Sequence, residues 1–173
     1  MILKRSLIFA SFIFSGFLYS QANVTFTLPV VTLMDVEPTG NITLNFTAPT
    51  EAGNPIGNPT PNTSKWINYT SAIASGGLTR KITAAISGTL IQGVNIRLQA
   101  AASGAGGGTL GVPSAQVTLT NTPVTIISGI GGAYTGNGSN NGHRLTISLV
   151  PSTYTALSAR SNTTLTIVYT ITE

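Results

Sequence analysis

The stretch TTLTIVYTITE, residues 163–173, decides the class of fold. Apolar and polar side chains alternate along it with a period of two, which is typical of a strand with one face toward a core. Threonine fills most of the polar positions, and the sequence ends one residue after the pattern stops. We therefore predict an edge strand whose inward face is formed by Leu165, Ile167, Tyr169 and Ile171.

The same alternation recurs along the chain, and no segment sustains the 3.6-residue period of a helix. Turn signals separate the alternating segments every 10–15 residues or so, and the sequence predicts about eight to ten short strands. The expected fold is an all-β, antiparallel, immunoglobulin-like β-sandwich, with a small β-barrel as the alternative. The segments between the strands include a proline-rich loop at 51–64 and two flexible glycine-rich loops at 102–111 and 131–142.

The first 22 residues have the features of a secretory signal peptide. Lys4 and Arg5 precede an apolar run from Leu7 to Tyr19, and small residues follow at the expected cleavage site. The run is shorter than the roughly 20 residues that a membrane-spanning helix needs. We expect one β-sandwich domain over residues 23–173, without a transmembrane span. The mature chain is expected to be exported to the outer cell surface or beyond, passing through the periplasm in transit.

Charged residues are scarce. They make up 7% of the chain, which contains no cysteine, and threonine, asparagine, serine and glycine supply the polarity instead. A surface with little charge gives little protection against self-association. The basic residues are scattered, and strand alternation sends the adjacent Arg80 and Lys81 to opposite faces. We therefore expect no nucleic-acid partner.

Residues suited to catalysis or metal binding are few. His143 is the sole histidine, and it is most simply an exposed turn residue after a glycine-rich loop. One histidine without cysteine is a poor basis for a zinc site. The glycine-rich loops lack the Lys-Ser/Thr pair of a phosphate-binding loop. We predict no catalytic residues, no cofactor and no metal, and hence a protein that is not an enzyme.

The segment after the signal peptide, NVTFTLPVVTLMDV, has a second interpretation. Val24, Phe26 and Leu28 lie on one face of a strand that is either the first strand of a closed sandwich or a strand exchanged with a neighbouring copy. This segment, the GNITLNFTAP segment and the final TTLTIVYTIT together resemble a fimbrial (pilin) subunit of Gram-negative bacteria, or a surface-coat protein with the same sandwich.

The resemblance implies a structural subunit that associates non-covalently with identical or homologous subunits, with a periplasmic chaperone during secretion. It also implies that Phe26 and Leu28 lie in the groove of a neighbour, and that the final strand, from Leu165 to Ile171, flanks such a groove.

A different class of function remains open from the residues alone. A monomeric adhesive or carbohydrate-binding module would use the loops rich in glycine and asparagine, because sugar sites combine an aromatic face with amide side chains. The candidates for such a glycan site are Trp66, Tyr134, Asn137 and Asn140.

Overall fold

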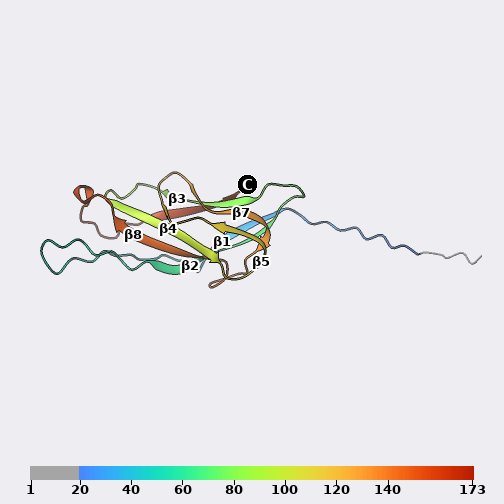
Figure 1. Cartoon of the computed structure of the whole chain (residues 1–173), viewed down its shortest axis with the longest axis horizontal. Helices are drawn as coiled ribbons and strands as arrows, with labels where there is room; N and C mark the ends of the chain where they lie inside the picture. The colour runs from blue at the N-terminus through green and yellow to red at the C-terminus, as the bar shows by residue number, and fades with distance from the viewer. Residues whose placement is uncertain (1–19) are drawn as a thin grey trace, which may run out of the picture.

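The computed structural model describes residues 20–173, and these form an all-β protein without an α-helix in the described range (Figure 1). A single short 3-10 helix, η1 (Tyr154–Ala156), precedes the last strand. The prediction of an antiparallel all-β fold with eight to ten strands is confirmed. The nine strands are β1 (Val31–Glu37), β2 (Asn62–Ala72), β3 (Arg80–Ser87), β4 (Val94–Ser103), β5 (Gly107–Pro113), β6 (Val117–Thr118), β7 (Val124–Tyr134), β8 (His143–Pro151) and β9 (Thr166–Thr172).

The strands form one continuous antiparallel sheet with two halves. The first half has the order β6-β4-β8-β2, with β1 on the other edge of β2. The second half has the order β7-β3-β9, with β5 also paired to β7. The halves are joined where β2 leaves β8 and pairs with β7, over only Thr70↔Tyr134 and Ser71↔Ala133.

The two halves face each other across one hydrophobic core. Fully buried side chains from the first half, such as Ile67 and Leu98, belong to the same cluster as Ile82 and Ile127 from the second half. The sheet therefore folds over on itself in the manner of a sandwich. Because β6 and β9 stand at opposite ends of the strand order, the sheet remains open, and the alternative of a closed barrel is wrong.

Two segments that carry the resemblance, after the signal peptide and at GNITLNFTAP, are not wholly strands of the sheet. Residues 20–30 are exposed and have no strand partner, and β1 begins only at Val31. Residues 41–46 have the expected alternation, with Ile42, Leu44 and Phe46 half-buried, but an isolated bridge at Thr47↔Gly57 is the only pairing near them. At residues 41–46 the alternating apolar side chains are the half-buried ones, although no neighbouring strand is present to complete the ladder, whereas both faces of residues 20–30 are exposed.

The glycine-rich segment 102–111 was expected to be a flexible loop, and this prediction is wrong for its second half. Gly107 begins β5, which pairs with β7 with a register shift between Gly108 and Leu110. Gly108 has φ +84°, and a Cβ there would lie 2.1 Å from the carbonyl oxygen of Gly132 on β7. The glycines are thus needed for close approach of two strands rather than for flexibility.

The predicted signal peptide lies almost wholly in residues 1–19, outside the described residues, and it stays a prediction together with the domain boundary at residue 23. In the described range, no helix has the length and apolar character needed to cross a bilayer.

Candidate assembly groove

One side of the sandwich is closed by backbone hydrogen bonds. The Leu119 N–H donates to the Ile96 oxygen on β4 at 2.8 Å, and the Ile86 N–H on β3 donates to the Thr120 oxygen at 2.8 Å. Residues 119 and 120 therefore bridge the two halves of the sheet. On the other side, β1 and β9 are both edge strands, and no backbone hydrogen bond joins them in the part of the chain that the structure describes.

We call the side of the sandwich between the edge strands β1 and β9 the open side. Apolar side chains along the open side are only half-covered. The four predicted residues of the last strand all pack against the core, yet each remains partly exposed; they are Leu165, Ile167, Tyr169 and Ile171. By contrast, Ile82 and Ala84, which pair with β9 from the adjacent β3, are 0% exposed. The predicted inward face is confirmed, and the missing cover lies on the side of β9 away from β3.

The opposite flank of the open side shows the same half-burial. Met34 and Val36 on β1, followed by Ile42 and Leu44 in the extended segment after it, pack against the core and are partly exposed. Both borders of the open side therefore present apolar side chains toward a space that no strand of the described chain occupies.

A groove of about 890 Å³ is hollowed at one end of this open side. Its two borders are the extended segments 44–49 and 157–163, and its base comes from the ends of β4 and β8, including Val94 and Leu149. Arg160 is the one charged residue among its lining. The loop after residue 49 is held near the groove because the Ile56 N–H donates to the Tyr154 hydroxyl at 3.1 Å.

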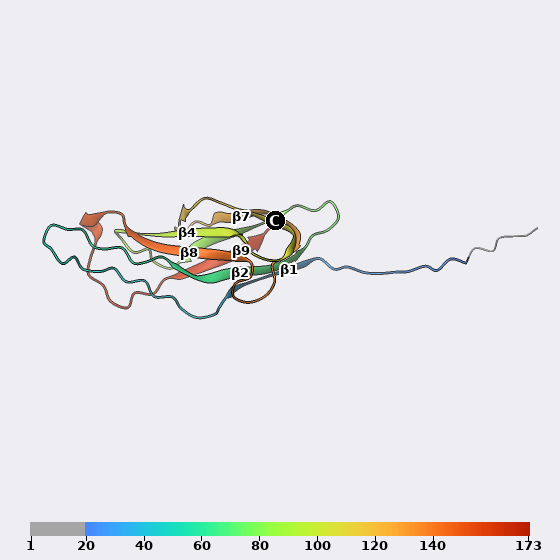
Figure 2. The ribbon, with the colours of Figure 1, turned by 60° about the horizontal axis from the view of Figure 1, so that its bottom comes forward.

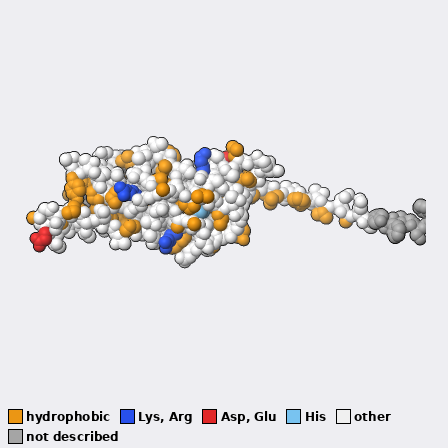
Figure 3. Space-filling model, in the orientation of Figure 1, with side chains coloured by type: hydrophobic (Ala, Val, Ile, Leu, Met, Phe, Trp, Pro, Cys, Tyr) orange, Lys and Arg blue, Asp and Glu red, His pale blue; other side chains and the backbone are white. Residues whose placement is uncertain are grey.

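The N-terminal segment, residues 20–30, projects from the opposite end of the molecule. In Figures 1 and 2 it leaves the body at the start of β1, whereas the loop around residues 50–60 lies at the other end of the long axis. Val24, Phe26 and Leu28 are 84%, 85% and 78% exposed, and hydrophobic side chains follow one another along this segment in Figure 3. The predicted inter-subunit residues thus contact little of their own domain.

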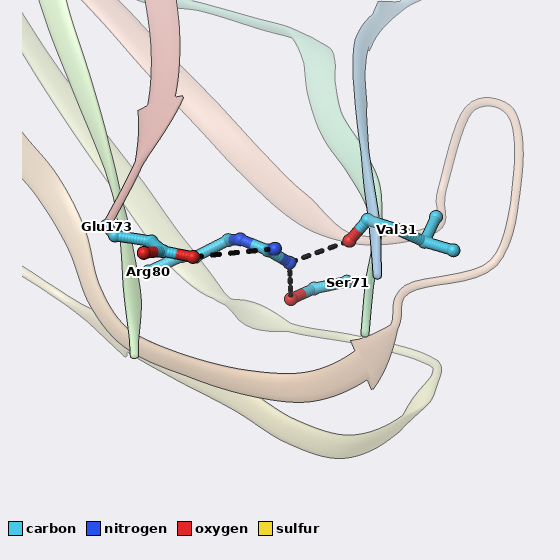
Figure 4. Close-up of polar contacts among 4 residues, drawn as sticks. All are labelled: Val31, Ser71, Arg80 and Glu173. Atoms are coloured by element: carbon cyan, nitrogen blue, oxygen red, sulfur yellow. Dashed lines mark hydrogen bonds and ion pairs between the residues drawn. The ribbon is translucent and has the colours of Figure 1, made fainter. Parts of the chain in front are cut away.

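Arg80 closes the open side at the end where this segment leaves the body (Figure 4). Its guanidinium is buried, and Nη1 donates at 2.7 Å both to the Val31 oxygen at the start of β1 and to the Ser71 hydroxyl on β2. Nη2 lies 3.9 Å from the carboxylate of Glu173, the residue after β9. Strand alternation correctly placed Arg80 and the exposed Lys81 on opposite faces, but it does not reveal this bridge.

The four candidate glycan-binding residues do not gather around one site. Trp66 is half-buried on β2, between Glu37 of β1 and Arg144 of β8. Tyr134 is 59% exposed and lies opposite Thr70, four residues along β2 from Trp66, which corresponds to roughly 13 Å. Asn137 and Asn140 are exposed in the loop after β7. The groove is lined by none of these four residues.

His143 was expected to be an exposed turn residue, and this prediction is wrong. It is 0% exposed at the start of β8 and stacks on Tyr69, with ring centroids 5.7 Å apart. Nδ1 lies 2.8 Å from the Ala101 carbonyl oxygen. Nε2 lies 3.0 Å from the Tyr69 hydroxyl and 3.2 Å from the Leu110 carbonyl oxygen, to which the Tyr69 hydroxyl donates.

This buried contact ties β8, β4 and β2 of the first half to β5 of the second. Burial lowers the pKa of His143 below its ordinary value, although the carbonyls of Ala101 and Leu110 act in the opposite direction. Burial also raises the pKa of Tyr69 to about 12. No carboxylate contacts the imidazole in the described structure, so its arrangement is that of a structural tie.

Stability is expected to depend on pH through His143. Because the folded protein holds the imidazole neutral, the unfolded chain binds the proton more readily near pH 6.5, and acid favours unfolding. Over the pH range just below about 7, the free energy of unfolding should therefore rise with pH, by at most about 1.4 kcal/mol per pH unit from this group. Urea unfolding of the wild type and of His143→Gln across this range measures the effect. An equal slope in both proteins would contradict the assignment.

Comparisons with known proteins give no relative: no family model, curated protein or solved structure matches the chain. Residues 20–173 also contain no cluster of three or more histidine, cysteine, aspartate or glutamate side chains that could hold a metal ion.

Proposed function

We propose that the protein is a non-enzymatic structural subunit of an exported, fimbria- or coat-like surface assembly, in which the N-terminal segment of one copy inserts into the open side of the next. The observation that carries the proposal is that the same chain has an apolar segment without cover and a sandwich with an uncovered apolar side. An extended segment exposes alternating apolar side chains, and a sandwich leaves apolar side chains half-covered along one open side.

The two parts are complementary in chemistry. An inserted strand places its backbone groups between the unpaired edges of β1 and β9, which is the β-strand addition known for peptide recognition. Val24, Phe26 and Leu28 would be removed from water, and each fully buried side chain of this size contributes roughly 1.5–3 kcal/mol. Hydrogen bonds along both edges would add to this gain.

The positions of the two parts favour a linear assembly. The segment leaves one end of the long axis, whereas the loop at residues 50–60 lies at the other end (Figures 1 and 2). This loop directly follows residues 44–49, which border the groove. Contacts of this head-to-tail kind do not close as a two-fold dimer does, and they generate open filaments when the rotation does not close a ring. The near absence of charge is compatible with repeated packing of identical copies.

Exposure of both parts before assembly is an aggregation hazard, because an open sheet edge and an apolar strand pair readily with other chains. We therefore include in the proposal a chaperone that covers the open side during export. The carbohydrate-binding alternative stays a prediction for which the placement of its four residues gives no additional support.

The experiment compares residues 23–173 with residues 31–173 by size-exclusion chromatography with light scattering over a range of concentrations. The longer protein should form concentration-dependent oligomers, and the shorter one should remain a folded monomer. A synthetic peptide of residues 23–30 should bind to the monomer and raise its melting temperature by mass action. A longer protein that stays monomeric at all concentrations would refute the proposal.

A further inference from the structure

Alternation alone leaves the position of an inserted strand ambiguous. A slip by one residue turns every apolar side chain to the wrong face, but a slip by two restores the correct face. The N-terminal segment has apolar residues at four alternating positions, from Val24 to Val30, so a copy displaced by two residues still presents three of them. A defined assembly needs some feature that fixes how far the strand enters.

Arg80 lies at the end of the open side where a residue could limit how far the inserted strand enters. Its guanidinium contacts the Val31 carbonyl oxygen on the β1 border and approaches the Glu173 carboxylate on the β9 border, so it spans the open side at one end (Figure 4). At the other end lies the groove bordered by residues 44–49 and 157–163. The open side thus has an entrance at the groove and an inner end at Arg80.

The guanidinium has donors to spare. Arginine carries five N–H groups, and the two on Nη1 are used by Val31 and Ser71. The Glu173 carboxylate is 3.9 Å from Nη2, beyond hydrogen-bond distance, and its side chain is 58% exposed. Among residues 20–173, no hydrogen-bond partner is present for Nε or Nη2.

We propose that Arg80 is the stop for the inserted strand of a second copy: its free N–H groups bind a carbonyl oxygen at the leading end of that strand, displacing the Glu173 carboxylate. This inference rests on the proposed function. A buried guanidinium is fixed in place by its bonds to β1 and β2, so it selects one position among those that alternation permits. Arg80 is then a specificity-determining residue for register rather than a source of general affinity.

Cysteine cross-linking tests the stop, because the native sequence has no cysteine. One protein carries Thr27→Cys, and its partners carry a single cysteine at position 164, 166, 168 or 170, which are the positions of β9 and its approach that face away from the core. Directly paired residues on adjacent strands have Cβ atoms about 4.5–5.5 Å apart, so the yield of disulfide reports the register.

With Arg80 present, one partner position should dominate by about tenfold or more, the preference expected from one hydrogen bond to a charged group. In Arg80→Met, cross-links should spread over positions two residues apart. Lys81→Met is the matched control, because Lys81 is the exposed neighbour on β3 and also contacts Glu173, at 3.0 Å. It should keep the single position.

The outcomes separate this inference from the proposed function. No assembly by the protein with Arg80 intact would refute the proposed function, whereas assembly with one sharp cross-link position in Arg80→Met overturns the stop alone. If Arg80→Met does not fold, Arg80→Lys is the alternative variant. Lysine keeps the positive charge but lacks the planar set of guanidinium N–H donors, and it should broaden the cross-link pattern.

Glu173→Gln, which removes only the competing carboxylate, should speed assembly without changing the register. An unchanged rate in that variant contradicts the displacement of Glu173.

Discussion

Replacing Phe26 with aspartate should abolish assembly while leaving the folded domain unchanged. Phe26 is 85% exposed, so the domain loses nothing when the ring is removed. In an assembled pair, the same change replaces a buried aromatic ring with a carboxylate that has no partner in an apolar groove. We expect a loss of association of at least about a hundredfold, which corresponds to roughly 2.7 kcal/mol.

The matched control is Thr27→Asp. It adds the same charge one residue further along, on the opposite face of the strand. Sedimentation or light scattering over a concentration series measures association, and thermal unfolding checks the domain. Thr27→Asp should assemble much better than Phe26→Asp. Equal losses in the two variants would show that charge on the segment, and not burial of one face, controls association.

Replacing Leu98 with alanine should have the largest effect on folding. Leu98 lies on β4, an interior strand of the first half of the sheet, and is 0% exposed. Removing three carbon atoms from such a site loses their burial and leaves a cavity, at a cost of roughly 2–5 kcal/mol. For a domain of this size, about 3 kcal/mol lowers the melting temperature by roughly 6–12 °C.

Val112→Ala provides the comparison for Leu98→Ala. Val112 is 70% exposed on β5, and exposed substitutions usually change stability by less than about 0.5 kcal/mol. Thermal and urea unfolding of both variants measure the difference. A similar small loss in both would mean that the two halves of the sheet do not share the compact core described above.

Period-two alternation predicted the fold because most of the strands obey it. The inward face of the last strand, formed by Leu165, Ile167, Tyr169 and Ile171, was identified correctly. The pattern could not reveal that residues 23–30 lack a partner strand within their own domain. Alternation shows which side chains need to be covered, but it does not show which chain covers them.

The alternating pattern could also have predicted that Arg80 and His143 are buried. Arg80 has the same parity as Ile82 and Ala84 on β3, and His143 has the same parity as Leu145 on β8, so both belong to the inward faces. Lys65 likewise shares the inward face of β2 with buried neighbours, and its ammonium group donates to the Gly40 oxygen at 2.7 Å. A charged or titratable residue in register with an apolar face is a signal for a buried structural contact. The partners of these residues come from distant segments, which a single sequence does not reveal.

The ladder between β1 and β2 has a mechanical consequence. The exposed segment continues directly into β1, which pairs with β2 from Val31↔Ala72 to Glu37↔Trp66. Tension transmitted through that segment pulls β1 along its own axis, at right angles to the hydrogen bonds of an antiparallel ladder. The hydrogen bonds of this ladder are then loaded simultaneously in shear, and they do not rupture one after another. A thread of such domains would resist stretching at the same place where each domain joins the next.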